Sequence, residues 1–189
     1  APKFNIVCQP NDWSRRVVEG AESTGLTESK QLQQEFWTVF RAYVLERKSV
    51  LRPTKPLPQN WMNISMGRSG CRLAAVASFW DSVAESYDSN ELRAEVVLDS
   101  EQSKQQFDTL AADKAEIEQE VGEQLTWYKP PNARMCRIYL RRSANLRDKG
   151  TWNEYAEWLL RKLEALHKAF SARVRNLSVE DQNGSRPDQ

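Results

Sequence analysis

Apolar side chains recur every three or four residues in three long stretches of the chain, and this spacing predicts three amphipathic helices. They cover residues 27–48, 100–121 and 151–175. Thr151 and Glu154 fit the T-x-x-E pattern, which predicts that their side chains cap the start of the last helix. The sequence therefore predicts three helices that are well separated along the chain.

Shorter apolar runs predict strands, which follow an extended, proline-rich connection over residues 51–60. The runs lie at residues 61–66, 71–79, 92–98, 125–128 and 135–140. In the third run Ala94, Val96 and Leu98 alternate with Arg93, Glu95 and Val97, and the apolar set is expected to face the core. The order αβββαββα is typical of an α+β fold with a mostly antiparallel sheet covered by helices.

The ends of the chain differ from its middle in composition. Residues 3–8 read as a strand that needs a partner sheet, and residues 20–25 are rich in Gly, Glu, Ser and Thr. We therefore predict that residues 1–25 are the end of a preceding domain and a linker. Residues 26–177 would form the α+β domain, and residues 178–189 a polar, disordered tail.

Composition excludes several classes of protein. Of 189 residues, 40% are hydrophobic and 28% charged, the net charge is +1, and no apolar run is long enough to cross a bilayer. We expect a cytoplasmic location and no membrane partner. Three distant cysteines, Cys8, Cys71 and Cys136, indicate reduced thiols, and the single histidine, His167, excludes a Cys/His zinc cluster. No metal and no cofactor are expected.

Charge is distributed unevenly along the sequence. Residues 41–72 carry a balance of +6, residues 79–125 one of −10 and residues 126–175 one of +8. The first segment supplies the candidate nucleic-acid-binding residues Arg52, Lys55, Arg68 and Arg72. Trp37, Trp61, Tyr128 and Trp152 would stack on bases if they are exposed. The competing interpretation is that the charged segments neutralise one another and that the tryptophans belong to the core.

Two motifs suggest phosphate chemistry, and each has a simpler structural explanation. Gly67-Arg68-Ser69-Gly70 lacks the spacing of a Walker loop and precedes a predicted strand, which favours a hairpin turn. Asp81 and Glu95 could hold Mg²⁺ as in the restriction-endonuclease core, but the lysine expected two residues after Glu95 is replaced by Val97. An Arg93/Glu95 pair on one face of the strand, either exposed or stapling the sheet, is the simpler account.

Several ordered pieces of the chain carry a family resemblance. They are Phe36-Trp37 with Phe40-Arg41, Leu51-Arg52-Pro53, Trp61-Met62-Asn63, Gly67-Arg68-Ser69-Gly70, Ala112-Asp113-Lys114, and Trp158-Leu159-Leu160 before His167 and Phe170. Together they resemble the bacterial domain of unknown function 4268, over roughly residues 26–177. The resemblance implies a domain appended to a nuclease-like, restriction-endonuclease-fold domain, with residues 4–13 similar to the junction between the two.

These observations lead to one expectation and two alternatives. We expect a non-catalytic accessory domain of a bacterial nuclease-like protein, which recognises DNA or RNA or positions the neighbouring domain. A degenerate metal-dependent nuclease that uses Asp81 and Glu95 is the first alternative. The second is a purely protein-binding or dimerising module, which leaves a homo-oligomer open.

Overall fold

The structure is a computed structural model that describes residues 26–87 and 89–177. The predicted strand over residues 3–8, the linker and the polar tail lie outside these ranges. The described elements are α2 (Glu28–Glu46), β1 (Trp61–Arg68), β2 (Cys71–Ser78), β3 (Asn90–Leu98), α3 (Ser103–Ala112), α4 (Lys114–Val121), β4 (Thr126–Tyr128), β5 (Cys136–Ala144), the 3-10 turn η1 (Lys149–Thr151) and α5 (Trp152–Asn176).

The strands form one five-stranded sheet in the order β1-β2-β3-β5-β4, and every neighbouring pair is antiparallel. The predicted α+β class and antiparallel sheet are thus confirmed. The alternation predicted for β3 is also confirmed, because Ala94, Val96 and Leu98 are fully buried while Arg93 is partly exposed on the opposite face.

The turn between β1 and β2 is the hairpin that the sequence predicts. Gly67 and Gly70 have φ angles of +79° and +76°, which residues with a side chain rarely adopt. A Cβ atom added at Gly70 would lie 2.8 Å from the Cβ atom of Ser100, so a side chain has no room there. The two glycines therefore serve the backbone of a tight turn.

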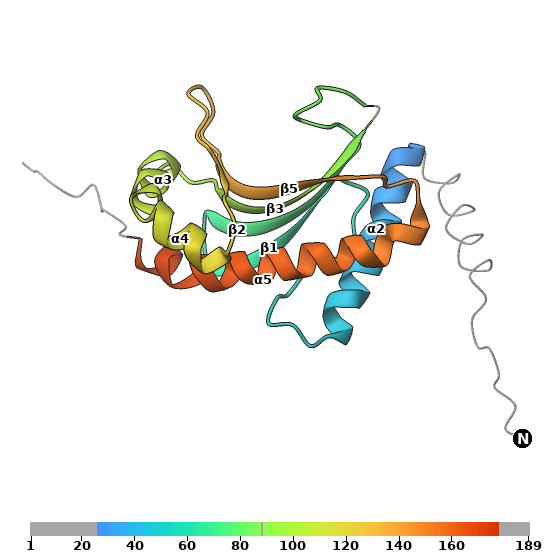
Figure 1. Cartoon of the computed structure of the whole chain (residues 1–189), viewed down its shortest axis with the longest axis horizontal. Coiled ribbons are helices and arrows are strands. Elements are labelled where there is room, and N and C mark those ends of the chain that lie inside the picture. Colours follow the sequence, from blue (N-terminus) through green and yellow to red (C-terminus); the bar gives the residue numbers. More distant parts are fainter. Residues whose placement is uncertain (1–25, 88, 178–189) are drawn as a thin grey trace, which may run out of the picture.

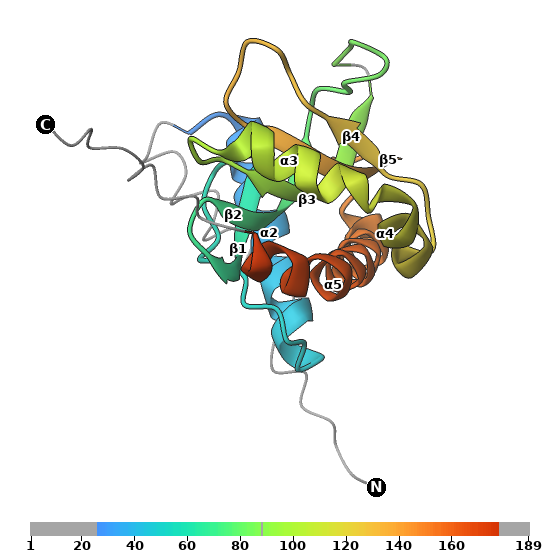
Figure 2. The same cartoon turned by 90° about the vertical axis from the view of Figure 1, so that its left-hand side faces the viewer.

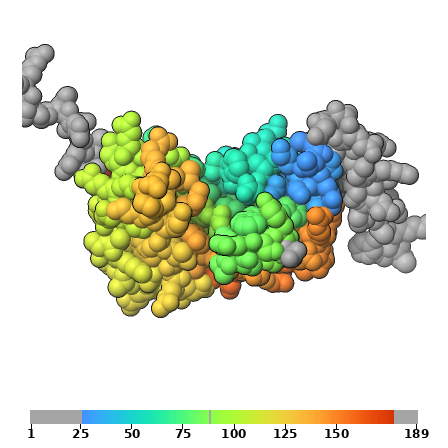
Figure 3. All heavy atoms as spheres, turned by 90° about the horizontal axis from the view of Figure 1, so that it is seen from above, coloured from blue at the N-terminus to red at the C-terminus, as the bar shows by residue number. Residues whose placement is uncertain are grey.

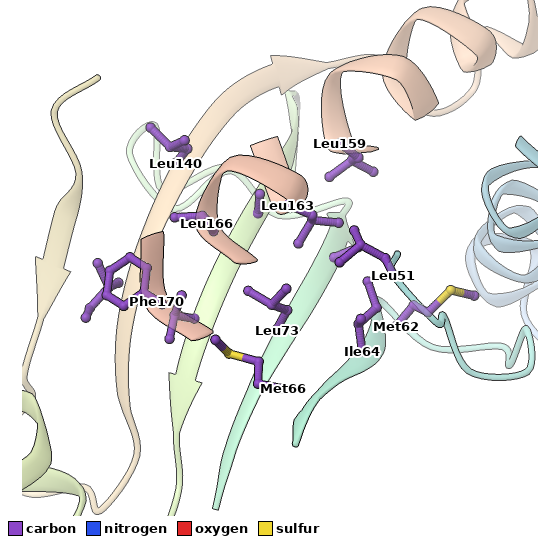
Figure 4. Packing of buried hydrophobic residues seen from close by; sticks show 14 of the residues in the cluster. Leu51, Met62, Ile64, Met66, Leu73, Leu140, Leu159, Leu163, Leu166 and Phe170 are labelled. Carbon is purple, nitrogen blue, oxygen red and sulfur yellow. The ribbon is translucent and has the colours of Figure 1, made fainter. Parts of the chain in front are cut away.

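Helix α5 covers one face of the sheet and provides most of the core (Figure 1). Figure 4 shows Leu159, Leu163, Leu166 and Phe170 of α5 beside side chains from β1 and β2. Leu159, Leu163 and Leu166 are fully buried, and burial of each such side chain contributes about 1.5–3 kcal/mol. Cys71 and Cys136 are free, buried thiols in the same core, whereas Cys8 lies outside the described residues.

Helix α2 packs against the N-terminal part of α5 through aromatic side chains. The ring centroids of Phe36 and Trp152 lie 5.6 Å apart, and Trp37 is fully buried and donates its indole N–H to the Gln59 carbonyl at 2.7 Å. That hydrogen bond ties α2 to the proline-rich connection. Within the described residues, no helix combines the length and the apolar character needed to cross a bilayer.

The helix predicted over residues 100–121 is two helices, α3 and α4, separated at Asp113. Asp113 donates its backbone N–H to Leu110 and leaves the helical conformation, with φ −96° and ψ +16°. The break lets Phe107 pack edge-on against Trp127 while Ile117 is buried further along. Figure 2 shows α4 beside α5, with α3 turned away toward the sheet. Apolar spacing alone does not reveal this change of direction.

The capping box predicted at Thr151 and Glu154 is wrong. Thr151 has a helical backbone conformation and makes no side-chain cap bond. Asp148 takes that role one turn earlier, because its carboxylate accepts the backbone N–H of Gly150 at 3.1 Å before η1. Glu154 pairs instead with Arg142 of β5 at 2.8 Å, so a tertiary contact has displaced the local one.

Candidate nucleic-acid interface

The face of the sheet opposite α5 has no helix lying over it in the described structure (Figure 1). The β2–β3 loop and the β4–β5 connection project beyond the strands on either side of it. Figure 3 looks onto this side and shows a hollow between the green β2–β3 loop and the orange β4–β5 connection. We call this surface of the sheet the open face.

Charged and polar side chains reach the open face because residues alternate along each strand. Register fixes which of them are neighbours: Arg72 of β2 lies opposite Val97 of β3, which lies opposite Arg137 of β5. Two residues further along the same pair of strands, and so on the same face, Glu95 of β3 lies opposite the small Ala74 of β2. Three neighbouring strands therefore supply two arginines and a carboxylate around a small residue.

A groove of about 270 Å³ lies on the open face. Small and medium side chains such as Val76 and Val97 form the apolar part of the groove. Trp61 also lines the groove and is 44% exposed. The polar lining comes from Asn60, Asn63, Arg72, Arg93, Glu95 and Arg137. A groove of this size is at the lower end of ligand sites, so it suits one base or another small planar group.

Ion pairs form a continuous chain across β3 and β5. Arg141 Nε lies 3.1 Å from Glu91 Oε2, and Glu91 Oε1 lies 2.6 Å from Arg93 Nη1. Arg93 Nε lies 2.6 Å from Glu95 Oε1, and Arg137 Nε lies 3.8 Å from Glu95 Oε2. The interpretation of Arg93 and Glu95 as a sheet staple is confirmed, and the chain holds the guanidinium groups in place beside the groove.

Four buried side-chain atoms of the described residues have no hydrogen-bond partner, and all four belong to groove residues. They are two acceptors, Asn63 Oδ1 and Glu95 Oε1, and two donors, Arg72 Nε and Arg93 Nε. Arg93 Nε and Glu95 Oε1 lie 2.6 Å apart and pair with each other as ions, so Asn63 Oδ1 and Arg72 Nε are the two groove atoms of this set without a partner of either kind. Since an unpaired buried polar atom costs about 1–3 kcal/mol, a ligand that pairs with Asn63 Oδ1 and Arg72 Nε would gain affinity.

The electrostatic balance of the groove favours an anionic or acceptor-rich ligand. Burial raises the pKa of the Glu95 carboxyl, and the charges of Arg93 and Arg137 oppose that rise. Three arginines and one carboxylate line the groove, an excess of two positive charges. Asp99, outside the groove, lies 3.6 Å from Arg72.

Every large aromatic side chain that is exposed among the described residues belongs to the open face or to the loop beside it. Trp61 lines the groove, and Tyr128 of β4 lies opposite Arg137 in the register. Trp80 and Tyr87, on the β2–β3 loop, pack edge-on with centroids 4.7 Å apart. Of the four aromatic residues singled out in the sequence, Trp61 and Tyr128 are exposed, whereas Trp37 and Trp152 belong to the core.

The structure does not bring Arg52, Lys55, Arg68 and Arg72 to one surface. Arg52 donates to the carbonyls of Ser49 and Leu51, and the connection that carries Arg52 and Lys55 lies on the α5 side of the sheet (Figure 1). Arg68 donates to main-chain carbonyls at the end of α5. Arg72 alone lies on the open face. Binding of nucleic acid by these residues stays a prediction.

Asp81 and Glu95 each have an arginine as a close partner. Arg141 Nη2 lies 2.7 Å from Asp81 Oδ1, which also accepts the backbone N–H groups of Val83 and Ala84. These loop hydrogen bonds, followed by those from Ser89 and the charge of Arg141, lower the pKa of Asp81 to about 2. Within residues 26–87 and 89–177, no group of three or more His, Cys, Asp or Glu residues is placed to hold a metal ion.

Asn63, Arg93 and Arg137 line the groove but are absent from the nucleic-acid residues chosen from the sequence. The signal that could have found them is strand alternation: Arg137, Tyr139 and Arg141 repeat in β5 as Arg93 and Glu95 do in β3. Charge summed over a segment hides that signal, because it mixes residues from both faces of the sheet.

Comparisons with known proteins give one family match. The model described as domain of unknown function (DUF4268) matches residues 32–174, a range that includes the whole sheet and nearly the full length of α2 and α5. No curated protein and no solved structure shows a significant match.

Proposed function

The chain belongs to the DUF4268 family, and we propose that it is a non-catalytic accessory domain that binds single-stranded nucleic acid on its open face. In a nuclease-like parent protein, such a domain would hold a strand near the neighbouring catalytic domain. DNA and RNA are both candidate partners.

The observation that carries the proposal is that arginines and exposed aromatic side chains lie together on one bare sheet surface. Arg72 and Arg137 flank the groove, with Trp61 and Tyr128 exposed on the same side of the sheet. Proteins that bind single strands combine positive groups for the backbone with aromatic rings on which bases stack. The open face offers both kinds of contact within a few register positions.

A single strand fits this surface better than a duplex does. A groove of about 270 Å³ accepts one planar group at a time, and bases reach such a site only when they are unstacked from a partner strand. The groove carries only two excess positive charges, so stacking and hydrogen bonds must supply much of the affinity.

The β2–β3 loop supports a second candidate, a protein-binding module. Val83 and Tyr87 are 70% and 75% exposed, so an apolar contact surface is available there. If the domain is such a module, removal of arginines from the open face should not change its affinity for the protein partner. The following experiment separates the two candidate functions.

The test is fluorescence anisotropy of the full chain with labelled ~9-nucleotide DNA and RNA strands and the matching duplexes, at several salt concentrations. Arg72→Ala/Arg137→Ala should weaken single-strand binding and reduce the salt slope, which is about −0.7 per phosphate neutralised. Trp61→Ala should weaken it by about 5- to 150-fold through lost stacking.

Arg52→Ala/Lys55→Ala is the matched control, because it removes the same charge from the α5 side of the sheet. If only this control variant loses affinity, the connection and not the open face is the binding surface. If the unaltered chain binds no strand at low salt, nucleic-acid binding is overturned and the protein-binding module takes first place.

A further inference from the structure

We infer that the groove reads a guanine base, with Glu95 accepting the two neighbouring donors on the edge of that base. The inference rests on the proposed function, because a bound single strand would bring the base to the groove. A free guanine nucleotide carries the same base, and the experiment below distinguishes the two sources.

Two buried polar atoms of the groove residues have no partner, Asn63 Oδ1 and Arg72 Nε, and two more, Arg93 Nε and Glu95 Oε1, pair with each other as ions. Asn63 Oδ1 and Glu95 Oε1 can only accept, while Arg72 Nε and Arg93 Nε can only donate. All four come from residues that line one groove of about 270 Å³. A complementary ligand therefore needs donors and acceptors together on a small planar frame.

The bases differ in the donors and acceptors that their edges present. Guanine carries N1–H and the N2 amino group side by side, with the O6 and N7 acceptors on the adjoining edge. Cytosine and adenine each offer a single amino group, and uracil or thymine a single N–H. Guanine is thus the base whose edges supply two neighbouring donors for a carboxylate and two acceptors for arginine. Arginine to O6 and N7 is also the commonest specific contact to guanine.

The Glu95 side chain has a fixed position in the centre of the sheet. It is 3% exposed, lies in the central strand β3, and is held from two sides by Arg93 and Arg137. Its carboxylate is therefore fixed before the ligand arrives, which lowers the entropy lost on binding. Trp61, exposed beside the groove, is placed to stack on the base that Glu95 reads.

The experiment uses the full chain and ~9-nucleotide oligouridylate strands whose central base is G, A, C, U or hypoxanthine. Hypoxanthine lacks only the N2 amino group. We expect the G strand to bind about 5- to 150-fold more tightly than the A, C and U strands, with the hypoxanthine strand between them. Equal binding of all five strands overturns the guanine inference and leaves the proposed function standing. No binding of any strand overturns the proposed function and, where free GMP does not bind either, the guanine inference as well.

Glu95→Gln supplies the matched variant, because it keeps the shape of the side chain and removes the second acceptor oxygen. It should abolish the preference for G, so that the G strand and the all-U strand bind with equal affinity, with thermal denaturation to confirm folding. Asn63→Ala, on the edge strand β1, should reduce the same preference if Glu95→Gln fails to fold. A preference that survives in a folded variant overturns the role of that residue.

Competition with free GMP and CMP separates the sources of the base. If GMP displaces the G strand and CMP does not, the groove reads guanine in either form. If GMP fails to compete while the strand preference persists, the base is read only within a strand. If GMP binds but no strand does, the guanine site stands and strand binding is overturned; a preference for CMP overturns the guanine site.

Discussion

Arg68, on the β1–β2 hairpin, donates a hydrogen bond from its guanidinium group to the main-chain carbonyl of Leu177, 109 residues further along the chain. The same group donates to the carbonyl of Val174 at 3.2 Å. Both carbonyls lie at the C-terminal end of α5, where helix carbonyls lack i+4 partners, although that of Val174 also accepts the backbone N–H of Leu177 at 3.4 Å. Arg68 therefore joins one edge of the sheet to the end of the covering helix and complements the negative end of its dipole.

This contact predicts a structural role for Arg68. Arg68→Ala should lower the free energy of unfolding by about 1–3 kcal/mol, because several main-chain acceptors lose a charged donor. Urea denaturation followed by circular dichroism measures the change, and Arg68→Lys should recover part of it. An unchanged midpoint and slope for Arg68→Ala would show that solvent replaces the guanidinium without cost.

Leu163 tests the packing of α5 on the sheet. Its side chain is fully buried, so Leu163→Ala should cost ~2–5 kcal/mol through lost burial and the cavity that remains. Arg161, two residues earlier and exposed, is the control, and Arg161→Ala should change stability by less than about 0.5 kcal/mol. Equal effects of the two variants would contradict the assignment of the buried face.

Asp148 and Thr151 test the start of α5. Since the Asp148 carboxylate accepts a backbone N–H before η1, Asp148→Ala should destabilise the protein by about 0.5–2 kcal/mol. Thr151 makes no side-chain cap bond, and Thr151→Ala should cost less than Asp148→Ala in the same thermal denaturation series. The reverse order would restore the capping box expected from the sequence.

Strand alternation and glycine placement predict most of this fold because they are local properties. The faces of β3 follow from the spacing of Ala94, Val96 and Leu98, and the hairpin follows from Gly67 and Gly70, whose φ angles are positive. The sequence does not reveal the break at Asp113 or the cap at Asp148. Both depend on the direction that a helix takes to reach its tertiary partners.

The candidate site is less predictable for the same reason. Arg68 and Arg72 are neighbours in sequence and equal in charge, yet Arg68 binds the end of α5 and Arg72 lines the groove. What separates them is which face of the sheet each side chain reaches, and whether a helix covers that face. The net charge of a segment contains neither piece of information. The sequence also suggests that Trp61 and Tyr128 could be exposed, but only the structure shows that they are.

Asp81 predicts a specific dependence of stability on pH. Its pKa is lowered to about 2 in the folded protein, so the folded state favours the ionised carboxylate relative to the unfolded chain, in which the pKa is about 4. Its contribution is therefore fully present above pH ~4 and is lost as the pH falls toward ~2. Asp81→Asn keeps an acceptor for the loop N–H groups but loses the ion pair with Arg141.

Denaturation midpoints of the original protein and Asp81→Asn should accordingly differ at pH 7 and converge as the pH falls from about 4 to about 2. Arg141→Gln, which removes the other member of the pair, should flatten the same dependence in part. A difference that stays constant over this range would show that the ionisation of Asp81 does not contribute to folding.

The arrangement of Asp81 and Glu95 predicts that this chain does not hydrolyse DNA or RNA in the presence of Mg²⁺ or Mn²⁺. Arg141 lies 2.7 Å from Asp81, and Arg93 lies 2.6 Å from Glu95, so a metal ion would have to displace both guanidinium groups. The position two residues after Glu95 holds Val97, where the nuclease motif needs lysine.

Incubation with plasmid, single-stranded DNA and RNA, with and without EDTA, measures the activity. Cleavage that EDTA stops and that both Asp81→Ala and Glu95→Ala abolish in folded protein would contradict the prediction and establish the nuclease alternative. Cleavage that persists in both variants would indicate a contaminating enzyme.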